Sequence, residues 1–555
     1  MTLTLLTGVL LIAMQASDQI KVCQVGYLPS ESKFAMLTAD ATGNAVIRRV
    51  LDNRSVVVAK IGEPTVDASS GDTVRLIDFS SLKEPGVYRV EVEGVGKSFD
   101  FRVGEQIFAY PFRLAMRSFL GQRCGTAVSL APDFPQYHYD ACHMAPAQFH
   151  ASSGKTGTKD MHGGWHDAGD FGKYVVNSGI TTGTLLWAYE LNEKKLKNLN
   201  LDLPESGGKT PDMLAEIRWN LDWMLKMQDD DGGAWHKETT ANFPGFIMPD
   251  EDKSPTLIIG NGQAPFKVTA ATADLVAVAA IGARLYPNYD RAFANKCLAA
   301  AEKGWTWLQA NKDNNYGRNP AGIGTGGYGD SNPSDERLWA AAELFRTTGH
   351  KEFTDYFLAN YTKWKPTVQG DAAQGWPELR NMAMWSYAMA KGANRSAANQ
   401  IKTDSLKAAD AIAARIVAHP YRMPLQQTEY YWGSNAVVAN YAMMLQIANR
   451  FKPEVRYRDG ALDSLHYLLG RNTFNTSFVT HVGTKWAMNP HHRPSAADKI
   501  EQPWPGLIVG GPNSSGKLDK PARQWKDEAA RYDLNENAIN WNAPLVFILA
   551  EELQP

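Results

Sequence analysis

The sequence predicts a mainly α-helical protein that carries a small all-β domain at its N-terminal end. The chain has 555 residues, which is too long for one ordinary core, so at least two domains are expected. Residues 18–104 contain short alternating runs between turn residues, whereas residues 105–555 contain long stretches with apolar side chains at helical spacing. The change between these two patterns places a domain boundary at Gly104.

The first 17 residues resemble a secretion signal. An apolar run from Leu3 to Met14 is followed by the small residues Ala16 and Ser17, although the usual basic start is missing. The run is too short to span a bilayer, and no other segment is apolar enough to do so. We therefore expect residues 1–17 to be a signal peptide and the protein to be secreted or periplasmic, without a membrane partner.

Residues 18–104 are expected to form a small β-sandwich. Gly86–Val92 alternates between apolar and polar side chains, Gly94–Gly96 provides a turn, and Ser98–Val103 alternates again. Earlier short apolar runs occur at strand-like spacing between Gly, Asn, Asp and Pro residues, at positions 22–25, 34–37, 56–58 and 74–77. About 85 residues with this pattern are typical of a two-sheet sandwich.

Residues 105–555 are expected to form one large helical domain. Thr210–Asp212 combines an N-cap residue, a proline at the first helical position and an acid in the first turn, and an apolar stripe follows over residues 214–225. Further helices are predicted at 271–286, 291–310, 334–349, 380–392, 402–418, 436–451 and 459–469. The simplest arrangement of so many helices is a closed ring of helical hairpins.

Composition excludes some partners and favours others. The net charge is −2 and the pI about 6.7, which argues against nucleic acid or an anionic membrane as a partner. The 16 Trp and 21 Tyr residues exceed what the core needs, and flat aromatic faces stack on sugar rings. The alternative is that most of these rings pack in the core. Long loops rich in Gly, Pro, Trp and Tyr occur at 312–333, 366–379, 419–434 and 471–526, where binding sites are usually built.

Two separate segments carry candidate acids and bases. In Gly163–Asp170, a tight Gly-rich turn holds Asp167 and Asp170, so that one carboxylate can hold a water while the other deprotonates it. Alone, this turn could equally be an ordinary surface turn. Glu536 stands in an apolar and aromatic setting, where a carboxyl group gains a raised pKa, although a solvated helix residue is the simpler reading of that segment.

Three motifs in one order resemble glycoside hydrolase family 9, in the subgroup with an N-terminal immunoglobulin-like domain. Gly164–Asp170 fits the base motif of that family, Phe478–Arg493 fits its first signature, and Trp525–Ala543 fits its second. The resemblance covers nearly the whole chain. It implies an (α/α)6 barrel catalytic domain over residues 105–555 and an immunoglobulin-like β-sandwich over residues 18–104. It also implies an endo-acting β-1,4-glucanase, or cellulase, whose substrate is a β-1,4-glucan, and we expect a monomer.

The resemblance assigns roles to residues of this sequence. Asp170 is implied to be the general base, with Asp167 helping to hold the water, and Glu536 the general acid. Further implied residues are His491 and Arg493 along the glucan near the cleavage point, Asp527 supporting the loop of the acid, and Trp541 near the cleaved sugar. Trp541 stands where the family more often has Tyr, so the aromatic face is kept and a hydroxyl group is lost.

The expected chemistry is a single displacement. A proton must reach the leaving oxygen while water attacks the anomeric carbon from the opposite face, and this requires two carboxyl groups roughly 6.5–9.5 Å apart. Asp167 and Asp170 are too close in sequence to form that pair, whereas Asp170 and Glu536 can face each other across a barrel mouth. The sequence therefore predicts hydrolysis with inversion.

Two metal sites are expected from clustered donors. Cys124, Cys142, His143 and His166 supply two thiolates and two imidazoles, a tetrahedral Zn²⁺ set, with buried free thiols as the alternative. Similar positions bind zinc in the family subgroup. Ser331, Asp335 and Glu336 resemble a Ca²⁺ site of the family, although acids in a first helical turn are favoured by the helix dipole in any case.

Substrate contacts are further expected from aromatic residues in the Gly-rich loops: Tyr328, Trp376, Tyr430 and Trp432. Three rival functions stay open at this point. An exo-acting hydrolase of the same fold, such as a β-glucosaminidase or a cellobiosidase, differs only in how loops close the cleft. A non-catalytic sugar-binding protein is opposed by the joint presence of the three carboxyl groups. A zinc hydrolase needs an open coordination position, which four ligands would close.

Overall fold

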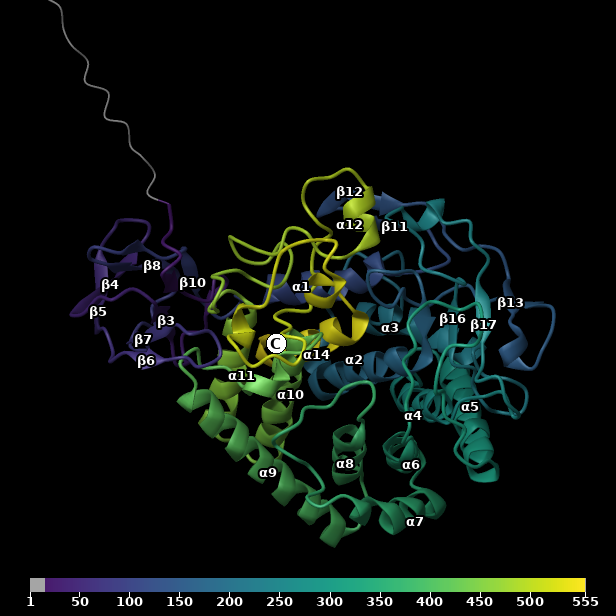
Figure 1. Cartoon of the computed structure of the whole chain (residues 1–555). Coiled ribbons are helices and arrows are strands. Elements are labelled where there is room, and N and C mark those ends of the chain that lie inside the picture. Colours follow the sequence, from purple (N-terminus) through teal and green to yellow (C-terminus); the bar gives the residue numbers. More distant parts are fainter. Residues whose placement is uncertain (1–14, 555) are drawn as a thin grey trace, which may run out of the picture.

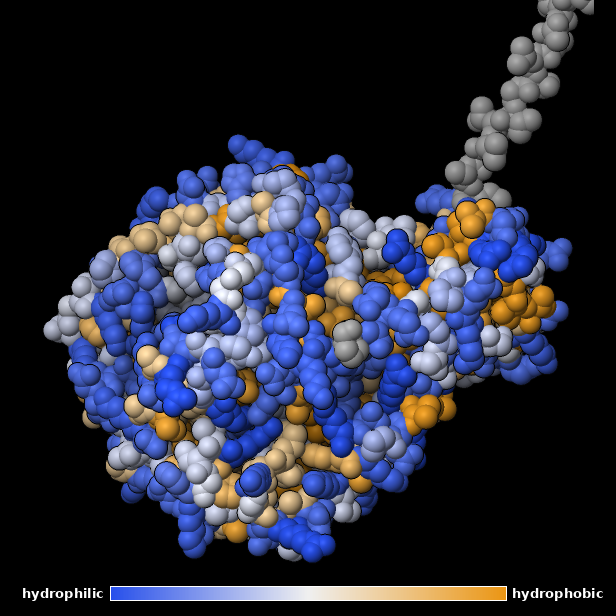
Figure 2. Space-filling view, turned by 180° about the vertical axis from the view of Figure 1, so that it is seen from behind, coloured by the Kyte–Doolittle hydropathy of each residue, from blue (hydrophilic) through white to orange (hydrophobic). Residues whose placement is uncertain are grey.

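The structure, a computed structural model, describes residues 15–554 and comprises a small β domain beside a large helical domain (Figure 1). The predicted signal peptide, residues 1–17, lies almost wholly outside the described residues. Within residues 15–554, no helix has the length and apolar character that crossing a bilayer requires. The two domains form a large and a small lobe with a mostly hydrophilic surface (Figure 2).

The β domain consists of two stacked sheets. One has the order β1 (Ile20–Lys21), β3 (Phe34–Leu37), β7 (Thr73–Asp78), β6 (Thr65–Val66). The other has the order β2 (Gly26–Tyr27), β10 (Phe101–Val103), β8 (Gly86–Val92), β4 (Asn44–Arg49), β5 (Ser55–Lys60), and β9 (Gly96–Lys97) pairs with β8. The Tyr27 ring lies edge-on to Phe79 and Phe101, each at 5.2 Å between centroids, and so joins the two sheets through their shared core.

Six helices form the inner wall of the helical domain: α2 (Val175–Leu196), α4 (Thr269–Leu285), α6 (Ser334–Thr348), α8 (Arg380–Met389), α10 (Ser434–Phe451) and α14 (Ile539–Glu552). Each packs on the next from α2 to α8, α10 packs on α14, and α14 closes the ring on α2. Asn381 of α8 and Met444 of α10 bridge the remaining pair, with 3.9 Å between Nδ2 and Sδ. Side chains all round these helices are buried, as inner-wall helices require.

The outer layer completes an (α/α)6 barrel. Its helices are α1 (Ala109–Gly121), α3 (Asp212–Lys226), α5 (Arg291–Ala310), α7 (Lys351–Asn360), α9 (Arg395–Ala418) and α11 (Val455–Leu468), which alternate with the inner helices along the chain. Two short helices, α12 (Arg493–Ala497) and α13 (Tyr532–Asn535), lie in the loops near the C-terminal end of the chain. The predicted closed ring of helical hairpins is therefore confirmed.

Small sheets formed by the connecting segments lie at the end of the barrel where the inner helices begin. A five-stranded sheet has the order β14 (Thr158–Lys159), β13 (Ala147–Phe149), β17 (Leu257–Ile259), β16 (Lys237–Thr239), β15 (Lys173–Tyr174), and β11 (Val128–Leu130) pairs with β12 (Phe134–Tyr139). Strand β15 runs directly into α2, so the sheet fixes the chain immediately before that helix.

The two domains are joined through buried polar contacts. Lys21 Nζ donates to the carbonyl of Thr473 at 3.2 Å, and Tyr421 Oη donates to Asp72 at 2.6 Å. His466 Nε2 of α11 lies 3.2 Å from Glu31 Oε1, with both side chains almost fully buried. The β domain therefore covers part of the barrel wall.

Candidate active site

The turn Gly164–Asp170 connects the barrel to strand β15 and carries two carboxyl groups. Trp165 is fully buried and anchors the turn, since its Nε1 donates to Glu216 at 2.9 Å. A Cβ atom at Gly169 would lie 1.9 Å from the carbonyl oxygen of His491, so only glycine fits there. The carbonyl of Asp167 accepts from the N–H of Ile539 at 2.9 Å, which ties this turn to the start of α14.

Asp167 is buried among hydrogen-bond donors. Its Oδ2 accepts from Tyr328 Oη at 2.6 Å, and its Oδ1 accepts from Asn177 of α2. Burial nevertheless raises the pKa of Asp167 to about 8, and the nearby charge of Asp170 adds to this shift. Asp167 therefore keeps a proton more readily than an ordinary aspartate.

Asp170 has a different electrostatic environment. Its Oδ2 accepts from the Gly172 N–H at 2.9 Å and from Tyr174 Oη at 3.3 Å. Burial raises the pKa of Asp170, while the positive charge of Arg493 opposes the rise. A nearby positive charge and two hydrogen bonds therefore favour the ionised form of Asp170.

Glu536 lines the same cavity as these aspartates, from a segment far away in the sequence. Its backbone is held between two segments, because it bridges His491 and its carbonyl accepts from the Gly510 N–H at 2.7 Å. Burial raises the pKa of Glu536 well above the usual range, and the charges of Asp170 and Asp167 raise it further. A carboxyl group in this setting stays protonated and can donate.

One cavity of about 300 Å³ brings these groups together. The three carboxyl groups of Asp167, Asp170 and Glu536 all line it, at the end of the barrel where the inner helices begin. Aromatic rings form much of the remaining wall: Tyr174, Phe243, Tyr328, Trp376, Trp432 and Trp541. The arrangement places carboxyl groups that can donate or accept protons beside aromatic faces on which a sugar ring can stack.

Three further predicted residues, His491, Arg493 and Asp527, do not line this cavity. His491 Nδ1 lies 2.6 Å from the carbonyl of Ala529, and Arg493 Nη1 donates to the carbonyl of Gly169 at 2.7 Å. Asp527 accepts from the backbone N–H groups of Met488 at 2.6 Å and Asn489 at 2.8 Å. It also accepts from the side chain of Asn535, the neighbour of Glu536, at 2.8 Å, so it fixes the loop that carries Glu536.

The predicted aromatic contacts divide into two groups. Tyr328, Trp376, Trp432 and Trp541 line the cavity. Tyr430 does not, and its prediction as a substrate contact is wrong: its side chain is 1% exposed and packs in the core, whereas Trp432 is 48% exposed. A ring without an exposed face cannot stack on a sugar.

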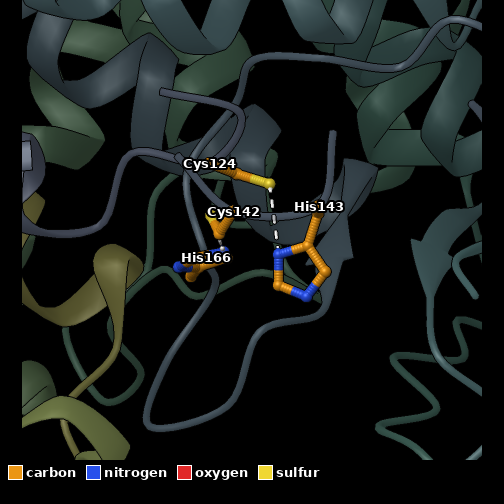
Figure 3. Close-up of side chains that lie close together, drawn as sticks. All are labelled: Cys124, Cys142, His143 and His166. Carbon is orange, nitrogen blue, oxygen red and sulfur yellow. Dashed lines mark hydrogen bonds between the residues drawn. The ribbon is translucent and has the colours of Figure 1, made fainter. Parts of the chain in front are cut away.

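The four predicted zinc ligands converge (Figure 3), and one of them, His166, belongs to the turn that carries Asp167 and Asp170. Their donor atoms all lie within 4.8 Å of one another, with 3.8 Å between Cys124 Sγ and His143 Nδ1 and 3.8 Å between Cys142 Sγ and His166 Nε2. His143 Nε2 lies 3.5 Å from the buried carboxylate of Asp252, the outer partner that metal-binding histidines usually have. A hydrogen bond with Cys142 lowers the pKa of Cys124 well below its usual value. The donor set fits a metal ion.

Two of the three predicted calcium residues, Asp335 and Glu336, lie at the start of α6 near two further acids, Asp330 and Asp274 of α4. We define these four residues as the acidic cluster. Within residues 15–554 no protein donor meets either carboxyl oxygen of Asp274 or of Glu336, and both side chains are at most 1% exposed. The charges of Asp335 and Asp330, after burial, raise the pKa of Asp274 well above its usual value. Ser331 is exposed, and its carbonyl accepts from Asn315 at 2.9 Å.

The sequence analysis missed several residues of these sites. Tyr174 and Phe243 line the cavity from a strand and a loop that carry no motif by themselves. Asp274 lies inside the apolar helix α4, and a lone acid in a fully buried helix is a signal that could have drawn attention to it.

Comparisons with known proteins agree with this architecture. Residues 108–549 match the model of glycosyl hydrolase family 9, and residues 15–97 match that of the cellulase N-terminal ig-like domain. The chain is 36% identical over 540 residues to Endoglucanase D of Acetivibrio thermocellus, covering 97% of this chain and 83% of the relative. It is 33% identical to a xyloglucan-specific endo-beta-1,4-glucanase of Bacteroides ovatus, covering 96% of this chain and 93% of the relative.

Solved structures show the same fold. A family 9 glycoside hydrolase of Bacteroides ovatus superposes with a TM-score of 0.89 at 32% identity, covering 96% of this chain and 98% of that one. A Zn-binding triple mutant of the family 9 endoglucanase J30 gives a TM-score of 0.87 at 32% identity, covering 95% and 99%. AaCel9A in complex with cellobiose-like isofagomine gives 0.87 at 29%, covering 97% and 100%.

The barrel, its preceding sandwich and the cavity with three carboxyl groups define a glycoside hydrolase. The chain belongs to glycosyl hydrolase family 9.

Proposed function

We propose that the enzyme is an endo-β-1,4-glucanase that inverts the anomeric configuration, with Asp170 as general base, Glu536 as general acid and Asp167 helping to hold the water. One observation supports this assignment above others. Three buried carboxyl groups line one cavity, and their surroundings differ. Arg493 lowers the pKa of both Asp170 and Glu536, but the charges of Asp170 and Asp167 raise that of Glu536, whereas the Gly172 N–H and the Tyr174 hydroxyl favour the ionised form of Asp170. An ionised acceptor and a protonated donor are therefore present at the same pH, as general acid–base catalysis requires.

Substrate chemistry is inferred from the wall of the cavity. Trp376, Trp432 and Trp541 offer aromatic faces for sugar rings. Of the two relatives above, one is named an endoglucanase and the other a xyloglucan-specific endo-beta-1,4-glucanase. Other relatives are named a cellodextrinase and a cellulose 1,4-beta-cellobiosidase, so exo action is the second candidate. Loop closure at one end of the cavity separates the two modes.

Product analysis tests the proposal. With a soluble β-1,4-glucan, proton NMR in the first minutes should show the α-anomer, because one displacement by water inverts a β-linkage. Viscosity should fall well before reducing ends accumulate, since internal cuts shorten chains faster than end cuts. An initial β-anomer would contradict Asp170 as base, and a slow viscosity loss with one dominant small product would favour the exo mode.

A structural zinc ion is proposed for Cys124, Cys142, His143 and His166. Four protein ligands leave no open position, so the ion would hold the loop and not activate water. His166 directly precedes Asp167, and its N–H donates to the Gln122 carbonyl at 2.7 Å, so the site lies next to the catalytic turn. Metal analysis should find about one zinc per chain. Cys142→Ser should lower the melting temperature and leave the product anomer unchanged, whereas Cys297→Ser, a buried cysteine outside this group, should keep the zinc.

A calcium ion is proposed for the acidic cluster. Carboxyl oxygens without donors are costly when buried and are the ligands that Ca²⁺ prefers. Asp335 and Glu336 would contribute from α6, Asp274 from α4, and Asp330 from the preceding loop. Ser331 would contribute through its carbonyl if its contact with Asn315 were exchanged.

Export and a monomeric state are retained as proposals. Export is based on the apolar run from Leu3 to Met14, which lies outside the described residues. Fractionation of the native host, with mass determination of the protein in solution, tests both.

A further inference from the structure

Two neighbouring residues of the small sheet hold two neighbouring carbonyl groups beside the catalytic aspartates. Lys237 Nζ donates to the carbonyl of Gly326 at 2.5 Å, and also to Asn319 Oδ1 at 2.8 Å and Thr325 Oγ1 at 3.2 Å. His236 Nε2 lies 2.7 Å from the carbonyl of Gly327. Burial lowers the pKa of His236 to about 3, so the ring is neutral and donates this bond through Nε2. The first residue of strand β16 and the residue before it thus bind the segment 325–328 at two successive carbonyl groups.

Segment 325–328 in turn contacts Tyr174 and contains Tyr328, and the hydroxyl groups of these two tyrosines donate to the aspartates. The Gly326 N–H donates to Tyr174 Oη at 3.2 Å, and Tyr174 Oη donates to Asp170 at 3.3 Å. One residue beyond Gly327, Tyr328 donates to Asp167 at 2.6 Å. The two tyrosine rings lie 4.7 Å apart, and a Cβ atom at Gly326 would approach both rings to 3.2 Å. Little room is left for the segment to shift without moving both hydroxyl groups.

We propose that Lys237 is a positioning residue of the hydrolytic reaction, which holds segment 325–328 so that Tyr174 and Tyr328 keep their hydroxyl groups on Asp170 and Asp167. This inference rests on the proposed function, in which Asp170 is the general base. Lys237 touches neither the cavity nor the reacting carboxyl groups by hydrogen bonds, so it acts through the segment.

The charge of Lys237 suits this role. The titratable groups that face it are the rings of Tyr174 and Tyr316, at 5.4 and 5.8 Å from Nζ to the centroids, the neutral His236 on its own strand, and Asp170. Burial lowers the pKa of Lys237 to about 7, and the charge of Asp170 opposes that fall. Lys237 is therefore charged below about pH 7. The two aromatic faces stabilise the cation in place.

Replacing Lys237 tests the inference through kinetics and pH dependence. Lys237→Met removes the charge and the donors while keeping most of the side-chain volume, and Lys237→Gln keeps a neutral donor. We expect kcat to fall about 100-fold in the Met variant, with a smaller fall in the Gln variant and KM nearly unchanged, because misplacement of reacting groups acts on the chemical step. Loss of hydroxyl donors raises the pKa of Asp170, so the acidic limb of the kcat profile should move to higher pH by about one unit.

Lys267→Met is the matched control. Lys267 is also a buried lysine, and its Nζ lies 2.8 Å from Asp229 and 4.8 Å from the Trp235 ring centroid. This variant should lose stability and keep the acidic limb in place. A wild-type kcat and acidic limb in folded Lys237 variants would overturn the inference, as would an equal shift in the Lys267 variant, or failure of both Lys237 variants to fold.

Asp170→Asn, measured in parallel, distinguishes failure of the positioning role of Lys237 from failure of the general-base role of Asp170. An inactive Asp170→Asn protein beside unaffected Lys237 variants would refute the positioning role alone. An active Asp170→Asn protein would refute the proposed function, whatever the Lys237 variants do.

Discussion

Two groups of buried carboxyl groups lie at the same end of the barrel, and their surroundings differ. Asp167 and Asp170 accept hydrogen bonds from Asn177, Tyr328, Tyr174 and a backbone N–H, and Arg493 supplies an opposing charge. In the acidic cluster, Asp274 and Glu336 meet no protein donor within the described residues. Carboxyl groups with different hydrogen-bond and charge partners have different pKa values, so that one can accept a proton at a pH where another can donate one. Carboxyl groups without partners need a cation to become stable in the ionised form.

The largest expected effect is a loss of turnover when carboxyl groups of the cavity, and not those of the acidic cluster, are replaced. Asp170→Asn and Glu536→Gln should each lower turnover of an unactivated glucan by about 10²–10⁴-fold, the usual contribution of a positioned proton transfer. The wild-type kcat should follow a bell-shaped pH profile. Activity appears as Asp170 loses its proton and disappears as Glu536, whose pKa is raised, loses its own.

Glu343→Gln is a control for these variants. Glu343 is a fully buried acid on α6, paired with Arg284 at 2.7 Å, and it does not line the cavity. Its replacement should cost stability without changing the pH profile. Near-native turnover in Asp170→Asn or Glu536→Gln would show that the residue concerned does not have the assigned role.

The sequence was sufficient to single out the three carboxyl groups of the cavity because they lie in local motifs. Asp167 and Asp170 share one short turn, and Glu536 lies in a second signature, so the resemblance located them before any fold was known. The inner helices α2 and α14 were not predicted. Besides lacking a polar face, α2 contains Gly179 and Gly183 and α14 contains Pro544, which are residues that disfavour helices.

Side-chain direction in loops could not be predicted. Tyr430 and Trp432 lie two residues apart in one aromatic loop, and only packing decides that Tyr430 points into the core while Trp432 faces the cavity. Asp274 was missed for another reason: it is far from Asp335 along the chain, and only the contact between α4 and α6 brings the two carboxyl groups together.

The second prediction concerns the acidic cluster and has an intermediate expected effect. After passage over a chelating resin, added Ca²⁺ should stabilise the wild-type protein by about 2.7 kcal/mol at a free concentration 100 times Kd. Asp274→Asn should remove this Ca²⁺ response and stabilise the metal-free protein, because one of the mutually repelling groups is gone. Thermal unfolding measured across a Ca²⁺ titration checks both, with Mg²⁺ and Zn²⁺ as comparison ions.

Glu343→Gln is again the matched control, since it neutralises a buried acid of the same helix that already has a cationic partner. It should retain the full Ca²⁺ response. If the wild-type protein showed no response to Ca²⁺, the calcium proposal would be wrong, and the acidic cluster would have to hold its protons at neutral pH.

The smallest expected effect comes from the catalytic group itself. Asp167 has a folded-state pKa of about 8 against an ordinary value of 3.8, so its cost to stability is absent below about pH 4, grows between pH 4 and 8, and then levels off. Asp167→Asn removes this cost, but the Tyr328 hydroxyl must reverse its hydrogen bond, which offsets part of the gain. We expect a net stabilisation of about 1 kcal/mol at pH 7 that vanishes at pH 4.

Asp170→Asn should gain less stability than Asp167→Asn, because Arg493 already offsets the cost of the charge at that position. Denaturant unfolding of both variants at pH 4 and pH 7 measures the difference, and a gain for Asp167→Asn that does not change with pH would mean that Asp167 is already ionised in the folded enzyme.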